Sequence, residues 1–396
     1  MSEVDVREAP ATAGGDAPPP REKTPATYRL LLATTFALVG MGLVMVLSAS
    51  SVESFSTYHS SFLFFRKQLL GAAIGVVVMV FLARCDYRRL RGLVRPLFWL
   101  TLGALVAVLV PGVGVSGGGS SRWLTFGPLS FQPSELAKLA LILIAAHTLE
   151  RKGRWVGDLR ELTMPVLPLT AMACLLVLMQ PDLGTCVIAV ASVGVVMYLA
   201  GARVRHIAGI LGAGAGVGLM YIMTKGYQRA RITSYLHPWA DPLKGGYQLI
   251  QGQLALGSGG LFGVGLGNSR QKWSFLPNAK TDFIFAIIGE ELGLIGALVV
   301  LATFAFFIYL GIRTAREAPD KFGFLVAGGI TAWIGIEALI NIGAVTGLLP
   351  ITGVPLPLIS FGGTSLVVTL AGIGVMLSIA RRGRPTRAKD PARSRA

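Results

Sequence analysis

Residues 273–293 read WSFLPNAKTDFIFAIIGEELG and join a polar loop to a long apolar run. Pro277 closes the loop, because proline has no N–H and disfavours helical geometry in the residue before it. Thr281 and Asp282 follow where a helix would begin, and short oxygen-bearing side chains at such a place cap free backbone N–H groups. Asp282 therefore has two interpretations: a helix cap, or a catalytic carboxylate at the rim of a cavity inside a membrane.

The apolar run carries Glu290 and Glu291 roughly two turns in. They are either buried glutamates satisfied by neighbouring helices or functional intramembrane acids. Relative to Asp282, helix geometry puts Glu290 roughly 80° and Glu291 roughly 180° around the axis, and both on the order of 12–14 Å deeper. We therefore expect neither to share a substrate hydroxyl with Asp282.

Composition indicates an all-α polytopic membrane protein. Of the 396 residues, 53% are hydrophobic and 14% are charged, and the mean hydropathy is +0.64. A soluble domain of this length does not need so much apolar surface. The three cysteines, Cys85, Cys174 and Cys186, offer no disulfide framework.

Apolar runs predict about ten transmembrane helices. The first is too long, and its polar leader too extended, for a secretory signal peptide. The runs are residues 28–51, 68–83, 93–110, 134–149, 162–179, 184–201, 206–224, 283–311, 323–346 and 361–380.

Basic residues alternate between the connections. The second, fourth, sixth and eighth are rich in Lys and Arg, whereas the third, fifth and ninth have almost none. The positive-inside rule then places both termini in the cytoplasm, and it accounts for an excess of 36 basic over 20 acidic residues without nucleic acid. Residues 1–27 are predicted to be a disordered tail, residues 28–380 the membrane domain, and residues 381–396 a basic tail.

The seventh connection, residues 225–281, is a large extracytoplasmic loop. Its aromatic residues and its apolar series predict a folded cap with one or two interfacial helices rather than disorder. A glycine-rich turn, GSGGLFGVGLG, follows them. No strand precedes this turn, so we assign the glycines to close backbone packing or ligand approach rather than to nucleotide binding.

Other polar residues gather at the outer face of the membrane. Arg122 is the basic residue of an otherwise uncharged third connection, and it is either a snorkelling anchor or a bidentate phosphate ligand. Glu135 and Lys138, three residues apart on one helix face, are either an intrahelical ion pair or part of a polar interior. Gln180 and Asp182 belong to a tight turn, where Asp182 has good turn chemistry of its own.

The ninth connection, GLLPITGVPLPLISFGGTS, is rich in proline and glycine. Non-helical backbone at membrane depth is tolerated only where protein or a wet cavity surrounds it, so this stretch predicts a re-entrant lining of a site. The sequence has no HExxH, CxxC, phosphate-binding P-loop or Ser-His-Asp pattern, and its four histidines lack metal-ligand spacing.

The chain resembles the FtsW/RodA (SEDS) family of peptidoglycan glycosyltransferases, most like the division-type FtsW branch. The resemblance covers residues 28–380 and rests on four blocks in order: SRWLTFGPLSFQPSELAKLALI, QPDLGT, GYQLIQGQLALGSGGLFGVGLGNSRQKWSFLPNAKTDFIFAIIGEELG and LPITGVPLPLISFGGTS. The family's proposed catalytic aspartate corresponds to Asp282. This chain departs from the family pattern at Asn278, where a glutamate is common, at Lys280, where a histidine is frequent, and at Phe361, where a tyrosine is common.

The resemblance implies polymerisation of lipid II on the outer face of the cytoplasmic membrane. Asp282 would deprotonate the attacking sugar hydroxyl, and the helix N-terminus and Lys280 would keep it ionised. Arg122 is the first candidate for the lipid diphosphate, with Lys272 and Arg270 in reserve and Lys280 as a further contact. The remaining candidates line the cavity: Glu135, Lys138, Gln180 and Asp182. A divalent cation, Mg²⁺ or Mn²⁺, bridging the diphosphate is compatible with this scheme, although no dense acidic cluster calls for one.

The implied partners are membrane lipid, a class B penicillin-binding transpeptidase and other division proteins, at the division septum. Three alternatives stay open: an elongation-type RodA-like polymerase, a lipid II flippase and a division scaffold. A flippase would need polar groups through the bilayer depth and paired halves, neither of which is evident. A scaffold would not need Asp282 or Arg122.

Overall fold

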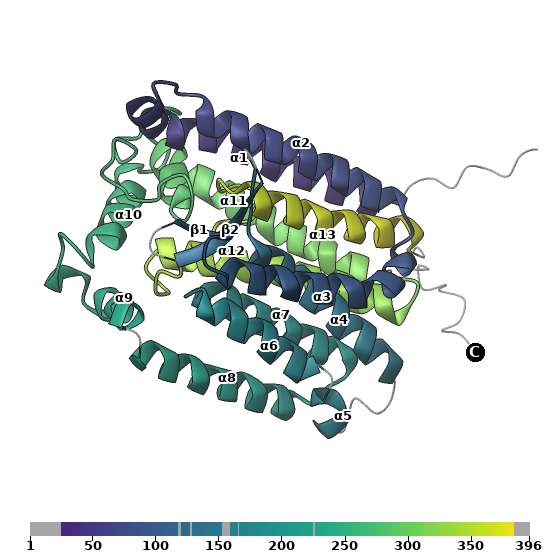
Figure 1. The fold of residues 1–396 in the computed structure, drawn as a ribbon. Coiled ribbons are helices and arrows are strands. Elements are labelled where there is room, and N and C mark those ends of the chain that lie inside the picture. Colours follow the sequence, from purple (N-terminus) through teal and green to yellow (C-terminus); the bar gives the residue numbers. More distant parts are fainter. Residues whose placement is uncertain are drawn as a thin grey trace, which may run out of the picture.

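The computed structural model describes residues 25–117, 120–126, 129–152, 159–164, 166–224 and 226–383. Long helices run side by side between an end that carries α9, α10 and a small sheet and an end from which the C-terminus leaves (Figure 1). Within the described residues, eight helices are long and apolar enough to span a membrane. They are α1 (Ala26–Tyr58), α2 (Leu63–Arg84), α3 (Leu90–Leu109, after η1, Tyr87–Arg89), α7 (Leu183–Ala200), α8 (Val204–Thr224), α11 (Ile284–Arg316), α12 (Lys321–Val345) and α13 (Gly363–Arg382).

Two further helices bring the bundle to the expected ten. The helix α6 (Val166–Met179), preceded by the short α5 (Leu159–Thr163), is apolar but only 14 residues long. The helix α4 (Pro133–Lys152) is 20 residues long, but it carries several charges and packs against α3, α7 and α12 instead of facing lipid. The predicted all-α polytopic fold is confirmed.

The third connection differs from its prediction as a loop. Its described residues form a three-stranded antiparallel sheet of β1 (Gly114–Gly117), β2 (Ser120–Phe126) and β3 (Leu129–Phe131). Leu124 pairs with both Gly114 and Phe131, so β2 is the central strand. The glycine-rich sequence hides the strand pattern, and the sheet sets the position of Arg122 on β2.

The helices of the core approach one another closely. Between α2 and α13, a Cβ on Gly374 would lie 2.6 Å from the backbone oxygen of Met79, so only glycine fits there. In a membrane the hydrophobic effect contributes little to helix association, because lipid is as apolar as the side chains. Small residues at helix interfaces instead allow close van der Waals packing.

The glycine-rich turn packs against a break in α11. Gly293 interrupts the helix with φ +69°, and a Cβ there would lie 2.3 Å from the nitrogen of Gly263. Across the break, Val264 N donates to Glu290 O (3.0 Å) and Leu294 N donates to Gly260 O (2.9 Å). The prediction that these glycines serve close backbone packing is confirmed.

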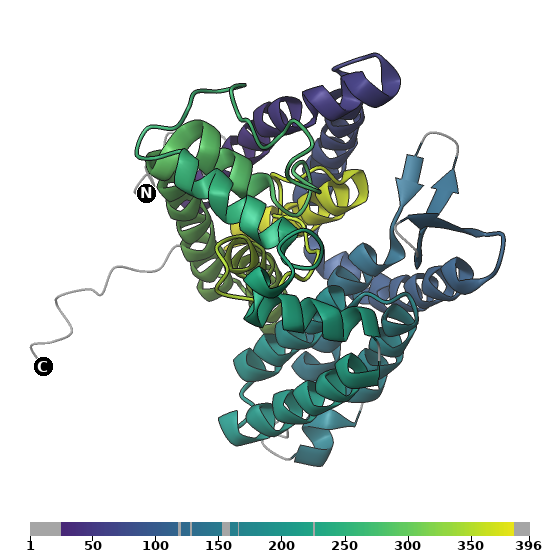
Figure 2. The same cartoon turned by 90° about the vertical axis from the view of Figure 1, so that its left-hand side faces the viewer.

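The large loop forms the predicted helical cap. It contains α9 (Gly226–Leu236), η3 (Pro238–Ala240) and α10 (Tyr247–Ser258). α10 packs on α11, and Tyr235 of α9 donates its hydroxyl to Leu348 O at 2.9 Å. Figure 2 faces this end and shows the cap helices lying across it, with the sheet to one side.

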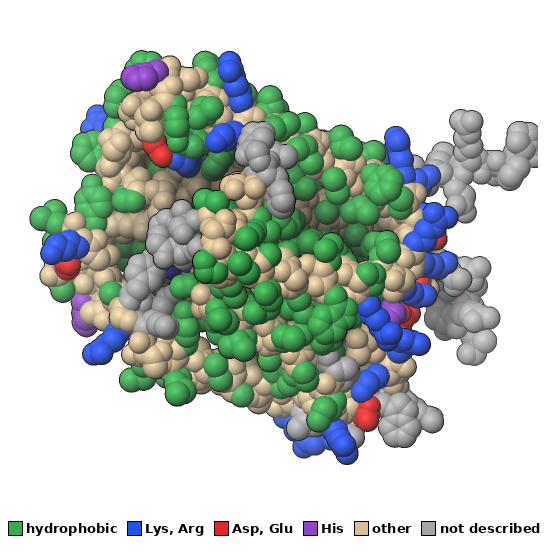
Figure 3. Space-filling model, viewed as in Figure 1, with side chains coloured by type: hydrophobic (Ala, Val, Ile, Leu, Met, Phe, Trp, Pro, Cys, Tyr) green, Lys and Arg blue, Asp and Glu red, His purple; other side chains and the backbone are tan. Residues whose placement is uncertain are grey.

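Both ends of the described chain lie together at the opposite end. The Thr27 hydroxyl donates to Glu317 at 3.0 Å, and Gly383 lies beside the same glutamate. Lys and Arg gather along that end of the face in Figure 3. Most of the two predicted tails, residues 1–24 and 384–396, lies outside the described residues.

Candidate active site

Asp282 immediately precedes α11 but does not cap it. The N-cap position is Phe283, and no side chain caps the helix there. Instead, Asn341 Nδ2 of α12 donates to the backbone oxygen of Asp282 at 2.8 Å. The interpretation of Asp282 as a helix cap is therefore wrong, because the turn is held through its backbone and the carboxylate is left for other contacts.

The stretch between α12 and α13 packs against this turn. Ser360 Oγ donates to Thr281 O at 2.6 Å, and Phe361 N donates to Lys280 O at 2.9 Å. Gln68 Nε2 of α2 donates to Ser360 O at 3.1 Å. This non-helical backbone is buried among helices and hydrogen-bonded to them, as expected, and its role as the lining of a site stays a prediction.

Arg122 joins the sheet to the fifth connection. Its Nε donates to Gln180 O at 3.0 Å and its Nη2 to Pro181 O at 2.7 Å. Gln180 in turn donates through Nε2 to Leu105 O of α3 at 3.1 Å. Arg122 is therefore held at a defined place at the end of the bundle that carries the sheet.

Asp182 serves as the N-cap of α7. Its carboxylate accepts from Thr185 N (3.1 Å) and from Thr185 Oγ1 (2.9 Å), as expected of a turn residue. The same charge also acts electrostatically on Asp282. Charges from the third and fifth connections thus both act on Asp282.

Arg231 of α9 lies on another side of Asp282, and our sequence analysis missed it. A Cβ on Gly353 would lie 3.6 Å from Asp282 Oδ2 and 3.7 Å from Arg231 Nη2, so the three residues share one small space. Gly353 has φ +76°, a conformation that favours glycine. The missed signal was a basic residue in a loop predicted to be extracytoplasmic, the same signal that drew attention to Arg122.

The carboxylate of Asp282 is half-buried and, among the described residues, accepts no hydrogen bond. Burial raises the pKa of Asp282 from 3.8 to about 6, and Asp182 adds to this rise, whereas Arg231 and Arg122 oppose it. We expected Lys280 to hold Asp282 ionised, and this is wrong. Lys280 pairs instead with Glu53 and lies 3.9 Å from the ring centre of Phe64.

Glu135 and Lys138 form a closed polar cluster within the bundle. Lys138 Nζ lies 3.1 Å from Glu135 Oε1 and 2.9 Å from Glu337 Oε2, and all three side chains are buried. Trp333 Nε1 also donates to Glu337. The predicted polar interior is confirmed, with Glu337 as a partner that lies in the middle of an apolar span and gave no spacing signal.

Glu290 and Glu291 bind the loop that follows the glycine-rich turn. Glu290 accepts from Ser269 Oγ and from Arg270 N (2.9 Å), and Glu291 accepts from Ser48 Oγ of α1 (2.6 Å). Lys272 Nζ lies 3.4 Å from Glu291 Oε1 and is buried. In this structure the Lys272 side chain and the backbone nitrogen of Arg270 contact the glutamates, and the role of both residues toward a diphosphate stays a prediction.

The described residues contain no group of three or more His, Cys, Asp or Glu side chains placed to hold a metal ion. Near Asp282 the other carboxylate, Asp182, is occupied by Thr185, and two arginines supply positive charge. This donor set does not fit a metal ion held by the protein alone, so we route no chemical step through one.

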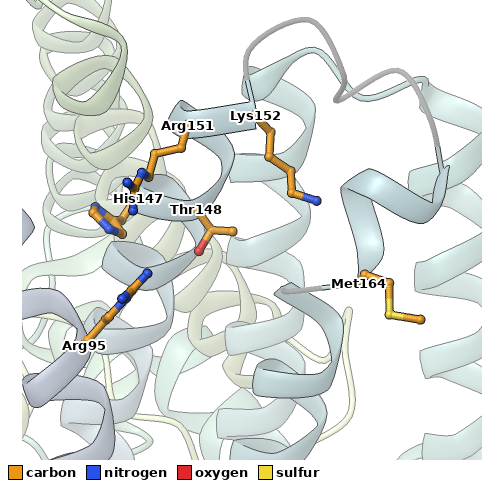
Figure 4. A pocket seen from close by; sticks show the side chains of 6 residues that line it. All are labelled: Arg95, His147, Thr148, Arg151, Lys152 and Met164. Carbon is orange, nitrogen blue, oxygen red and sulfur yellow. The ribbon is translucent and has the colours of Figure 1, made fainter.

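A hollow of about 380 Å³ lies away from Asp282, at the opposite end of the bundle. It is formed where α3, α4 and the turn after α5 meet (Figure 4). Basic side chains line it, and none of them is among the charged residues that act on Asp282, which are Arg122, Asp182 and Arg231. It is a separate feature of the molecule.

These features define a polytopic helical membrane protein in which the carboxylate of Asp282 accepts no hydrogen bond among the described residues and lies in the field of two arginines, at one end of the bundle. The sequence matches the cell cycle protein family FtsW/RodA/SpoVE over residues 28–384, and the chain belongs to that family.

Among its relatives, stage V sporulation protein E of Bacillus subtilis is 45% identical over 90% of this chain and 97% of that protein. The probable peptidoglycan glycosyltransferase FtsW of Geobacter metallireducens is 41% identical over 90% of this chain and 95% of its own length.

Solved structures agree with this membership. A chain from a study of how a peptidoglycan synthase complex coordinates polymerization and crosslinking is 31% identical, with a TM-score of 0.73, over 89% of this chain and 97% of that one. The rod shape determining protein RodA of Thermus thermophilus is 29% identical, with a TM-score of 0.66, over 90% of this chain and 97% of its own.

Proposed function

We propose that this protein is a peptidoglycan glycosyltransferase that polymerises lipid II into glycan strands. The observation that carries the proposal is Asp282: a carboxylate free of hydrogen bonds within the described residues, in the electrostatic field of Arg231 and Arg122, at the end of the bundle opposite the chain termini. The family membership supports it, since relatives of this chain are named as peptidoglycan glycosyltransferases.

In this mechanism Asp282 is the general base. It takes the proton of the attacking sugar 4-hydroxyl while that oxygen forms the new bond to C1 of the other sugar. The C1 bond to the lipid diphosphate breaks on the opposite face, so the anomeric configuration inverts, and the diphosphate leaves with the electron pair. A pKa of about 6 suits this role, because a base titrating near the working pH is largely ionised and more basic than an ordinary aspartate.

Arg122 and Arg231 stabilise the departing diphosphate. Arginine suits this task, because its planar guanidinium binds phosphate oxygens through two parallel hydrogen bonds. The Arg122 side chain is held by two backbone carbonyls, which pre-organises its charge beside the reaction centre. Gln180 and Asp182 hold the turn that positions Arg122, and the buried cluster of Glu135, Lys138 and Glu337 lies deeper in the bundle.

We further propose that both termini are cytoplasmic and that the Asp282 end faces the outside. The proximity of Thr27 and Gly383 to Glu317 supports termini on one side, and the alternation of basic connections supports the assignment of that side. Reporter fusions after Arg160 and after Gly245 are expected to report opposite sides. Two fusions on the same side would overturn the topology.

The proposed partner is a single-span class B penicillin-binding transpeptidase at the division septum. The fold shared with a chain of a peptidoglycan synthase complex supports a crosslinking partner, and sequence similarity to FtsW proteins supports a role in division.

The test uses the full chain, purified with this transpeptidase and reconstituted into liposomes with lipid II in both leaflets. We expect polymeric glycan as the product, measured by gel electrophoresis. The accessibility of lipid II on each side is measured in parallel. Exchange of lipid II between leaflets without polymer would favour a flippase. The absence of both polymer and exchange would favour a scaffold.

A further inference from the structure

The hollow at the cytoplasmic end is lined by side chains of three segments. Figure 4 shows Arg95 of α3 and Met164 of the turn after α5 on either side of a row of α4 side chains. The α4 residues are His147, Thr148, Arg151 and Lys152.

Neighbouring acids leave positive charge unbalanced in this hollow. Glu161 pairs with Lys152, and Glu150 pairs with Arg91 at 2.6 Å. Among the described residues, Arg95 and Arg151 form no ion pair with a carboxylate, and both are exposed. Two guanidinium groups from different helices therefore face one cavity with room for an anion.

The wall of the hollow continues into the lipid-facing surface. Trp99 lies one turn beyond Arg95 on the same face of α3 and is 60% exposed. Met164, on the far side, is 62% exposed. A cation at the membrane surface beside exposed apolar side chains fits a ligand with an anionic head and an apolar tail better than a soluble anion.

We propose that this hollow binds an anionic phosphate group, that of a lipid headgroup in the cytoplasmic leaflet. Arg95 and Arg151 bind the phosphate oxygens through charge-assisted hydrogen bonds, and the acyl chains lie along the Trp99 face of α3. The site goes beyond the proposed polymerase, whose chemistry lies at the other end of the bundle.

A general excess of basic residues on the cytoplasmic face is the competing explanation. It predicts that every exposed arginine of that face contributes alike. Arg203 and Arg205 serve as the matched control, because they are exposed residues of the predicted cytoplasmic sixth connection and do not line the hollow.

The experiment measures lipid retention by native mass spectrometry of the full chain in detergent, titrated with phosphatidylglycerol or with phosphatidylcholine. Arg95→Gln/Arg151→Gln is expected to weaken phosphatidylglycerol binding about thirtyfold. Arg203→Gln/Arg205→Gln removes the same charge and is expected to leave the binding unchanged. Thermal melts establish that each variant is folded. If a double variant does not fold, the corresponding single-substitution variants are used in its place.

A parallel titration with inorganic phosphate distinguishes the two sources of the phosphate group. Phosphatidylglycerol binding lost only in the Arg95/Arg151 variant supports a headgroup site. Binding of inorganic phosphate lost only in that variant, without lipid retention, supports the anion site but assigns it to a soluble phosphate. Equal losses in both double variants, equal binding of phosphatidylcholine, or no binding of either probe would overturn the proposal.

Discussion

Asp282, Glu290 and Glu291 lie within ten residues of one another, yet the hydrogen-bond partners of their carboxylates differ. Each glutamate accepts hydrogen bonds from the loop after the glycine-rich turn, and Glu291 also faces a lysine. Among the described residues, no hydrogen bond reaches the carboxylate of Asp282, although its backbone oxygen is held.

The difference separates acids that stabilise the fold from one that is available for chemistry. Buried charges are tolerated where partners compensate for lost hydration, as at Glu291. A carboxylate that is partly desolvated without such partners has its pKa raised, as at Asp282, and becomes a better base. Structural acids are saturated with contacts, and a catalytic acid or base keeps free positions for its substrate.

The largest effect on stability is expected for Lys272→Met. Removing this lysine leaves Glu291 buried without its cation, which costs about 3–5 kcal/mol. Lys280→Met is the control, because the partner of Lys280, Glu53, is half-exposed and such pairs contribute about 0–1 kcal/mol. Thermal melts compare the stability of the two variants, and turnover per folded molecule should persist in Lys272→Met. A well-folded Lys272→Met protein without turnover would instead assign Lys272 to the diphosphate.

Arg122→Lys is expected to lower polymerisation about 10–100-fold with little change in stability. Lysine keeps the charge, but it lacks the planar guanidinium that contacts Gln180 O and Pro181 O together. Without this group, a bidentate contact with a phosphate is also impossible. Initial rates of glycan formation provide the measurement. Full activity of the lysine variant would return Arg122 to the role of a membrane anchor.

Arg231→Gln tests the electrostatics of the site. Polymerisation by the unmodified protein should fall below about pH 6, where Asp282 becomes protonated and stops acting as a base. Because Arg231 opposes the rise of this pKa, its removal should move the acid limb of the pH profile to higher pH by about one unit. Arg229→Gln, an exposed neighbour on α9, should leave the limb in place. An unmoved limb in both variants would remove Arg231 from the site.

Much of the fold follows from sequence, because membrane spans are long, apolar and separated by charge. The exceptions are informative. The described residues between 114 and 131 form strands that glycines and loop-like spacing conceal. The charged helix α4 is enclosed by other helices, so its span is not marked by hydropathy. Hydropathy reports only how apolar a segment is, whereas burial inside a bundle depends on tertiary packing.

The site was predicted less completely. Asp282, Arg122 and Asp182 meet as expected from their shared membrane face. Arg231 reaches them because α9 folds back over the bundle and is tied through Tyr235 to Leu348, a long-range contact that no local pattern encodes. Glu337 joins Lys138 for the same reason.

The most direct measurement is polymerisation and thermal stability of Asp282→Asn in one preparation. Asparagine keeps the shape of the side chain and removes its basicity, so polymerisation should fall by about 10²–10⁴-fold. Stability should rise by about 1–3 kcal/mol above pH 7, because a carboxylate with a raised folded-state pKa destabilises the fold once it ionises. Asp241→Asn changes an exposed aspartate of the helical cap; it is the matched control and should change neither quantity. Robust glycan synthesis by a well-folded Asp282→Asn protein would contradict the assignment of Asp282 as the base.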